Sequence, residues 1–394
     1  MVDELTIGIA VPDLSEYVAL DRSWGIGDPE QQCIAAVERC RGDGRIPIHG
    51  RDLRLVFASY RSNQPAEKVD AARRLVDEGA FAVLGGRDFT DGALWLAAAK
   101  VPVIDVNAVP STTLELAAPW LFTLRAAQDV LYRSFVAWAH AGGHLDGRVI
   151  GIFCDRLTRQ ATAAAIDTLR RLGHDVRTVI DSDGIGVGSE HDESAPARFA
   201  GDGVDLLLGF VGGSSWINTL RAAQRIGYRP QLLDLETGEH TNDVTAQRFP
   251  PDLYNGTLAL TMSRVGDVAA ARPLGAETAR ALEAYERWRA VPDASADAMP
   301  SGEWSNVLIT SDLVTLLVEG LRCAGPDPER AALVAGLEQL RSVPMASGAD
   351  VTFGRGEHWG FRAARTIRWH ADRGAWTAVT DFDWPLACEG GQGA

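Results

Sequence analysis

Short apolar segments alternate with amphipathic segments along most of this chain. The apolar segments are rich in Val, Ile and Leu and predict buried strands, whereas the segments between them carry apolar residues at helical spacing. In the first part of the chain, strands are expected at 6–12, 53–59, 81–86 and 101–106, and helices at 29–41, 65–79 and 91–100. Strands and helices in this alternation predict a parallel sheet that is covered by helices on both faces.

The same rhythm returns after a connector near residues 122–126. Strands are expected at 148–154, 176–180, 204–210 and 231–235, and helices at 127–141, 158–172 and 215–227. We therefore expect an α/β protein with two doubly wound parallel sheets.

The last third of the chain has a different pattern, with long helices predicted at 305–325 and 328–340. Two β-like stretches follow at 351–356 and 365–372, and both are candidates to complete the earlier sheets. In that case the chain crosses between the two lobes more than once. The segments 181–203 and 289–303 are rich in Gly, Asp, Ala and Pro, so we expect surface loops there.

Length and charge narrow the range of partners. A chain of 394 residues is too long for one ordinary core, which agrees with two lobes. The net charge is −15 and no Lys/Arg-rich run offsets it, so nucleic acid and anionic lipid are excluded as partners. No apolar run approaches the ~20 residues that would span a bilayer, so no membrane insertion is expected. Neutral, zwitterionic or cationic small molecules remain.

The start of the chain, MVDELTIGIA, lacks the basic and apolar segments of a signal peptide. Two interpretations follow. The protein is extracytoplasmic (periplasm or cell envelope) if an export signal was removed from it, and otherwise it is cytoplasmic.

The familiar motifs of catalysis and cofactor binding do not occur. There is no GxGxxG after the first strand, no GxxxxGK[ST] loop, no GxSxG elbow and no HExxH. His140 and His144 are four residues apart, but Gly142 and Gly143 between them would break a helix. We therefore expect no enzyme activity, no cofactor and no metal.

The five cysteines have no framework spacing, and their odd number argues against a disulfide scaffold. Cys33 and Cys40 lie seven residues apart on one expected helix, beyond disulfide reach. A bridge between Cys323 and Cys388 is possible.

Residues 83–92, VLGGRDFTDG, form a candidate anion site. A buried strand stops there at two glycines, and Thr90 stands where a helix can begin. The segment lacks the Lys and the glycine spacing of a phosphate cradle. Two tryptophans, Trp24 and Trp216, are expected in loops where strands end, where an aromatic ring is placed to stack on a ligand or else packs in the rim or core.

Taken in order, these motifs resemble the type I periplasmic-binding-protein fold, and within it the leucine/isoleucine/valine-binding-like family of ABC-transporter solute-binding proteins. The similarity covers nearly the whole chain. It is carried by IGIAVP, SWG, GRIPIHGRDLRLVFAS, AARRLVDEGAFAVLGG, VPVIDVNAVPSTTL, FTLRAAQD, RVIGIFCDRLTRQ, LGFVGGSSWINTLRAAQRIGYRPQLL, SDLVTLLVEGLRCAG and VTFGRGEHWGF.

The resemblance implies two α/β lobes joined by three hinge crossovers, with a ligand cleft between the lobes. Lobe 1 would comprise 1–124 plus 262–357, and lobe 2 would comprise 125–261 plus 358–394. It also implies a non-enzymatic receptor that closes on a small molecule and delivers it to an ABC permease. The alternative is a cytoplasmic sensor on the same fold that regulates a protein partner.

The resemblance further implies which residues contact the ligand. In lobe 1, the loop after the third strand would hold a carboxylate through backbone N–H groups and a hydroxyl, the next loop would add polar contacts, and an aromatic would line the pocket. The corresponding residues here are Gly86, Arg87, Asp88, Phe89 and Thr90, then Asn107, Ala108 and Val109, and lastly Trp24. Thr90 would act as helix N-cap, as carboxylate ligand or as both.

In lobe 2, Glu236 stands where amino-acid binders place an acid that faces the ligand ammonium, unless it is a solvated loop acid. Leu157, Phe210, Gly212 and Trp216 fall in the remaining pocket positions. Leu157 replaces a common Tyr, and FVGGSSW has Phe210 and Trp216 instead of another Tyr, which implies a rebuilt pocket that is wider or more aromatic. The expected ligand is a small carboxylate-bearing molecule: an amino acid, an aromatic or modified amino acid, or an aromatic acid.

Arg87 replaces a small residue of the family's pattern. It either strengthens the anion site, fills it, or faces solvent as the partner of Asp88.

Overall fold

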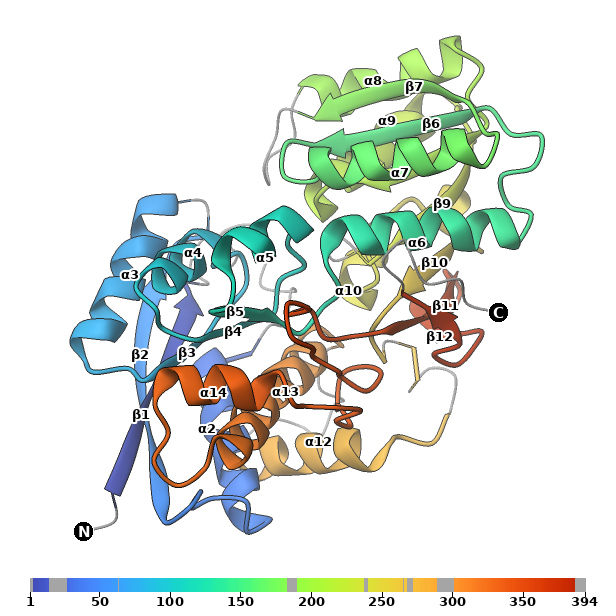
Figure 1. Ribbon diagram of the computed structural model, residues 1–394. Coiled ribbons are helices and arrows are strands. Elements are labelled where there is room, and N and C mark those ends of the chain that lie inside the picture. Colours follow the sequence, from blue (N-terminus) through green and yellow to red (C-terminus); the bar gives the residue numbers. More distant parts are fainter. Residues whose placement is uncertain are drawn as a thin grey trace. The chain divides into compact units, whose positions relative to one another are not determined.

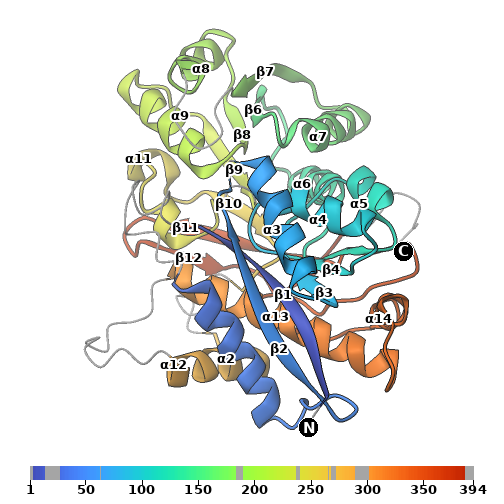
Figure 2. The same ribbon diagram turned by 90° about the vertical axis from the view of Figure 1, so that its left-hand side faces the viewer.

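The computed structural model describes residues 3–13, 27–62, 64–182, 190–236, 240–264, 266–267, 272–288 and 301–386. The chain divides into two compact units, which we call unit 1 (1–127 and 274–362) and unit 2 (128–273 and 363–394). It therefore passes from one unit to the other three times, and each passage lies somewhat C-terminal to the lobe boundary expected from the sequence. Each unit is an α/β layer structure (Figures 1 and 2).

Unit 1 is built on a parallel sheet with the strand order β2-β1-β3-β4-β5. Its strands are β1 (Asp3–Pro12), β2 (Arg51–Tyr60), β3 (Ala82–Leu84), β4 (Val103–Asp105) and β5 (Leu121–Thr123). The three short strands β3, β4 and β5 are buried along their whole length, which explains why the sequence is apolar there without alternation. The first four strands were predicted from the sequence, and β5 was not.

Helices cover both faces of this sheet. The helices α3 (Pro65–Asp77), α4 (Thr90–Ala98) and α5 (Ser111–Ala117) lie on one face, and α2 (Pro29–Gly42), α12 (Ala276–Trp288), α13 (Ser301–Ala324) and α14 (Arg330–Leu337) lie on the other (Figure 1). Local sequence sets the ends of these helices. Asp28 caps α2 by accepting from the N–H groups of Glu30 and Gln31, and Gly79 follows α3 in the left-handed region with φ 85°.

Unit 2 contains an eight-stranded sheet with the order β12-β11-β10-β9-β8-β6-β7, and β13 pairs with β11. The strands β6 (Ile150–Asp155), β7 (Val176–Ser182), β8 (Leu206–Phe210), β9 (Gln231–Leu235) and β10 (Leu258–Thr261) are parallel. The strands β11 (Ala363–His370), β12 (Ala375–Ala378) and β13 (Trp384–Pro385) extend this sheet in antiparallel fashion.

The helices α6 (Gln128–Ala141) and α7 (Arg159–Arg171) pack together on one face of the unit 2 sheet, and α8 (Glu190–Gly201) and α9 (Gly213–Arg225) pack together on the other (Figure 2). Two short helices, α10 (Asp243–Ala246) and α11 (Pro251–Tyr254), follow β9. The core holds large aromatic side chains that are fully or almost fully buried, among them Trp216, Trp369, Trp376 and Tyr254.

Two expectations from the sequence are wrong. The segment 181–203 is not one loop, because α8 occupies much of it and inserts Ala195 and Phe199 into the core. Pro196 and the neighbouring acidic residues interrupt the apolar pattern, so the sequence did not indicate a helix here. The stretch 351–356 is not a strand either, because Val351 forms only isolated bridges while its side chain and that of Phe353 are buried.

Three further expectations meet the limits of the described residues. Residues 289–300 of the second expected loop lie outside them, and 301–303 belong to α13. Cys33, Cys40 and Cys154 are buried free thiols, and Cys323 is an exposed free thiol, whereas Cys388 lies outside the described part of the chain. Within that part, none of the helices is both long and apolar enough to span a bilayer.

Candidate functional site

The loop between β3 and α4 begins with two glycines at the carboxyl end of the unit 1 sheet. A Cβ atom on Gly86 would lie 2.5 Å from the carbonyl oxygen of Ala10 and 2.7 Å from the hydroxyl of Tyr60. Only glycine therefore allows the backbone to pass this close to the ends of β1 and β2. The loop is held at the carboxyl edge of the sheet, which is where α/β proteins bind ligands.

Asn107 ties this loop to the loop after β4. Its Nδ2 donates to the carbonyl of Gly86 at 3.0 Å and to Asp105 Oδ1 at 2.6 Å. Its Oδ1 accepts from the N–H of Asp88 at 3.1 Å, where Asp88 has a left-handed φ of 57°. Asn107, itself a predicted contact residue, is half-buried. Its hydrogen bonds fix the backbone of the other predicted contact loop at Gly86 and Asp88.

Asp105 is a residue that the sequence analysis missed. It ends β4, is 1 % exposed, and accepts two hydrogen bonds from Asn107 on Oδ1. Within the described residues its Oδ2 has no hydrogen-bond partner. Burial raises the pKa of the Asp105 carboxyl to about 7, although the hydrogen bonds from Asn107 favour the charged form. The available signal was an acid at the end of the apolar segment VPVID.

Arg87 points back into unit 1 rather than straight into solvent. It is half-buried, and its Nε and Nη2 donate to Asn306 Oδ1 on α13 at 3.2 Å and 2.9 Å. Its own carbonyl accepts from the Tyr60 hydroxyl. The guanidinium is therefore held beside the loop, whereas Asp88 next to it is exposed.

The start of α4 differs from the expectation by one residue. Phe89, not Thr90, is the N-cap, so the prediction of Thr90 as N-cap is wrong. The Phe89 side chain is fully buried against the Tyr60 ring, with 5.1 Å between ring centroids, and Thr90 is half-buried as the first helical residue. In the described residues, the N-cap Phe89 makes no side-chain hydrogen bond to the first turn of α4. The backbone N–H groups of that turn can therefore bind an anion.

The other predicted residues of this loop pair are Ala108, which is half-buried, and Val109, which is 3 % exposed. Val109 packs in the core of unit 1. The prediction for Trp24 lies outside the described residues.

In unit 2, the turn that follows β6 is hydrogen-bonded to the carboxyl end of β8. Asp155 Oδ1 accepts from the N–H groups of Leu157 and Thr158 at 2.9 Å and 3.0 Å, and its Oδ2 accepts from the N–H of Gly212 at 3.2 Å. The Thr158 hydroxyl donates to the carbonyl of Phe210 at 2.6 Å. Leu157 stands out of this turn with 59 % of its surface exposed, and Gly212 is the N-cap of α9.

Glu236 directly follows β9 at the same edge of the sheet. Its side chain is 8 % exposed, so the alternative of a solvated loop acid is wrong. Oε2 accepts from the Thr261 hydroxyl at 2.8 Å and from the N–H of Met262 at 2.5 Å. A buried carboxylate is thereby fixed by neutral donors at the end of β9.

The expected loop position of Trp216 is wrong. It lies in α9, is fully buried, and stacks between Phe153 and His240 with ring centroids 6.4 Å and 5.9 Å away. The helix starts earlier than expected, at Gly213, and turns Trp216 toward β8. Phe210 is also fully buried, so both aromatic side chains belong to the core of unit 2 in this structure.

A family model described as "Periplasmic binding protein" matches residues 30–374 of the chain. The chain therefore belongs to the periplasmic binding protein family, and the resemblance inferred from the sequence is confirmed. No curated protein sequence matches it.

Solved structures agree on the fold. Similar ones include a leucine-binding protein from Thermotoga maritima (TM-score 0.71, 13 % identity, 95 % of this chain and 98 % of that one) and a branched-chain amino acid ABC transporter protein from Thermus thermophilus with bound valine (0.70, 16 %, 96 % and 96 %). A solute-binding protein from R. palustris in complex with 4-hydroxybenzoate is also similar (0.72, 15 %, 97 % and 99 %). At these identities the likeness establishes the type I periplasmic binding fold.

Proposed function

We propose that this protein is a non-enzymatic solute-binding protein that captures a small carboxylate-bearing molecule, an amino acid or an aromatic acid, for an ABC transporter. The observation that carries the proposal is the loop of residues 86–90, which presents the uncapped first turn of α4 at the carboxyl edge of the unit 1 sheet. Family membership and the ligands named for the similar structures, valine and 4-hydroxybenzoate, support it.

The carboxylate of the ligand is assigned to unit 1. The N–H groups of the first turn of α4 and the Thr90 hydroxyl supply donors, and the helix dipole adds about 0.3–1 kcal/mol for an anion at this end. Arg87, held by Asn306, places a positive charge beside the loop.

An amino group on the ligand is assigned to Glu236 in unit 2. Its hydrogen bonds from Thr261 and Met262 hold the carboxylate in place at the end of β9, where a ligand ammonium can form a charge-assisted hydrogen bond with it. An aromatic acid without an amino group would not use this residue. The ligand class is therefore decided by whether Glu236 contributes to binding.

The test combines a thermal-shift screen with calorimetric titration. Leucine, valine, phenylalanine and 4-hydroxybenzoate serve as probes, because a ligand at about 100-fold over its Kd stabilises the folded protein by about 2.7 kcal/mol. Any compound that binds is then titrated into Thr90→Ala, Glu236→Gln and the control Thr112→Ala, which changes an exposed threonine on α5.

For an amino acid, both Thr90→Ala and Glu236→Gln are expected to weaken binding at least fivefold, which corresponds to about 1 kcal/mol. For an aromatic acid, only Thr90→Ala should do so. Thr112→Ala should bind as the unaltered protein does. Absence of binding to every carboxylate probe, or equal binding by Thr90→Ala, would refute the proposed site, and conversion of a bound compound would refute the non-enzymatic role.

A further inference from the structure

Two helices of unit 2 end with the same hydrogen-bonded cap, and each cap positions a histidine. At the end of α6, the N–H of Gly143 donates to the carbonyl of His140 and the N–H of His144 donates to that of Ala139, both at 2.9 Å. Gly143 has a left-handed φ of 69°, as this cap requires. His140 is therefore fixed in the last turn of α6.

The end of α7 repeats this arrangement. Gly173 has φ 84°, its N–H donates to the carbonyl of Arg170 at 3.0 Å, and the N–H of His174 donates to that of Leu169 at 2.9 Å. His174 is therefore the third residue after Arg171, the last residue of the helix. Because α6 and α7 pack against each other, the two caps bring together histidines that are 34 residues apart in the sequence.

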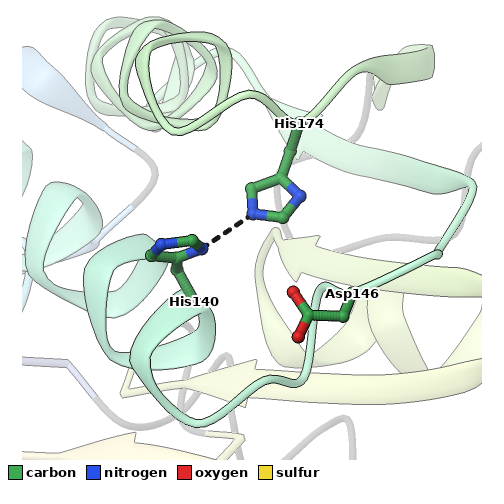
Figure 3. A group of neighbouring side chains, drawn as sticks. All are labelled: His140, Asp146 and His174. Atoms are coloured by element: carbon green, nitrogen blue, oxygen red, sulfur yellow. Dashed lines mark hydrogen bonds between the residues drawn. The ribbon is translucent and has the colours of Figure 1, made fainter.

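The two imidazoles face each other at the surface. His140 Nδ1 lies 2.9 Å from His174 Nε2, and the ring planes cross at 70° with centroids 5.1 Å apart. Asp146, in the turn after Gly143, directs its carboxylate toward this pair (Figure 3). One ligand atom from each of the three side chains lies within 4.8 Å of the others.

We propose that His140, Asp146 and His174 form a binding site for a divalent transition-metal ion such as Zn²⁺. Two imidazole nitrogens on one tetrahedral zinc, each at about 2.0–2.1 Å, are about 3.3 Å apart. The observed separation of 2.9 Å has to widen by only a few tenths of an ångström. Asp146 has to move closer, which its exposed position in a turn permits.

The surroundings favour a cation. Both helices direct their carboxyl ends, which carry negative partial charge, toward this region. The neighbouring arginines are engaged elsewhere: Arg170 pairs with Asp167, and Arg171 donates to Thr168. Two imidazoles with one carboxylate select zinc, nickel or copper over calcium and magnesium, which prefer oxygen ligands alone.

Three protein ligands leave one tetrahedral position for water or for a ligand from outside the chain. An ion here would join the ends of α6 and α7 within unit 2. This site was not expected from the sequence, where only the pair His140 and His144 drew attention. The structure instead pairs His140 with a histidine beyond the next strand and helix.

The experiment is a calorimetric titration of chelator-treated protein with ZnCl₂, accompanied by Co²⁺ absorption spectra that report tetrahedral coordination. We expect one Zn²⁺ per chain, at least tenfold weaker binding in His140→Gln and in His174→Gln, and a smaller loss in Asp146→Asn. The control is His191→Gln, an exposed histidine on α8 of the same unit. It should bind Zn²⁺ as the unaltered protein does.

Circular dichroism melting establishes that each variant is folded. Zn²⁺ should raise the Tm of the unaltered protein and of His191→Gln, but not that of His174→Gln. His174 lies outside α7, so we expect His174→Gln to fold. This variant therefore tests the metal site even if His140→Gln does not fold. Absence of Zn²⁺ binding to the unaltered protein, or unchanged binding by folded His174→Gln, would show that the histidines form only a hydrogen-bonded pair. Solute binding is measured in a separate experiment, so the metal site and the proposed function are tested independently of each other.

Discussion

The buried carboxyl of Asp105 makes the stability of unit 1 depend on pH in a predictable direction. Its pKa is about 7 in the folded protein, because burial disfavours the charged form, against an ordinary value of 3.8. For an acid whose pKa is raised by folding, the stabilising contribution is fully present below the unfolded pKa and is lost as the pH rises through the folded pKa. The window for Asp105 therefore extends from about pH 4 to pH 7.

The magnitude follows from the shift. A difference of about three pKa units corresponds to about 4 kcal/mol, of which about 3 kcal/mol is lost between pH 5 and pH 8. Asp105→Asn removes this titration while its amide oxygen keeps the role of acceptor for Asn107. The new amide N–H takes the place of Oδ2, which has no partner among the described residues, and adds a cost of about 1–3 kcal/mol that does not vary with pH.

The assay is urea unfolding from pH 5 to pH 8, followed by far-UV circular dichroism, for the unaltered protein and for Asp105→Asn. The quantity of interest is the difference between their free energies of unfolding, because other titrating groups contribute equally to both. Asp105→Asn should gain about 3 kcal/mol relative to the unaltered protein over this range. The control Asp77→Asn changes an exposed carboxyl on α3 and should show no such gain. Parallel pH profiles for Asp105→Asn and the unaltered protein would refute the reasoning.

Three further outcomes are expected. Gly86→Ala should destabilise unit 1 by about 1–3 kcal/mol and impair ligand binding, because its Cβ would lie 2.5 Å from the carbonyl of Ala10; wild-type melting and affinity would contradict this. Asn107→Ala should lower the unfolding free energy by about 2–4 kcal/mol in chemical denaturation, since it removes hydrogen bonds to both loops, and an effect below 1 kcal/mol would mean that the loops hold without it. Arg365→Met should cost about 3 kcal/mol because it removes the closer ion-pair partner of the buried Asp267 carboxylate and leaves it the more distant Arg264, at 3.6 Å, and the double variant with Asp267→Asn should recover part of that loss; a double variant less stable than the single one would argue against this electrostatic cost.

The fold was largely readable from the sequence because buried parallel strands and amphipathic helices leave strong periodic signals. The failures occurred where that signal was interrupted or where the segment was assigned another role. In helix α8 a proline and acidic residues interrupt the apolar pattern around Ala195 and Phe199, and β5 lies where a connector between the two lobes was expected. Trp216 was misplaced because the glycines before it suggested a loop, whereas α9 starts within them.

The alternation of elements indicates which loops follow the strands, and it drew attention to residues 86–90 after the third strand. Glu236 was singled out by the resemblance to amino-acid binders, and the ligand contacts of both stay predictions. Burial and hydrogen bonding are long-range properties, so the link from Asn107 to Asp105 and Asp88 left no sequence pattern. The encounter of His140 with His174 likewise depends on how two helices pack.

The bridge made by Asn107 has a consequence for any attempt to redirect this protein to a new solute. One amide group links the backbones of 86–88 and 105–107, so neither loop can be exchanged, lengthened or randomised alone without releasing the other. Libraries that vary both segments together while keeping Asn107 should yield folded variants far more often than libraries that vary either one across that position. The unit of redesign in this half of the protein is the linked pair of loops.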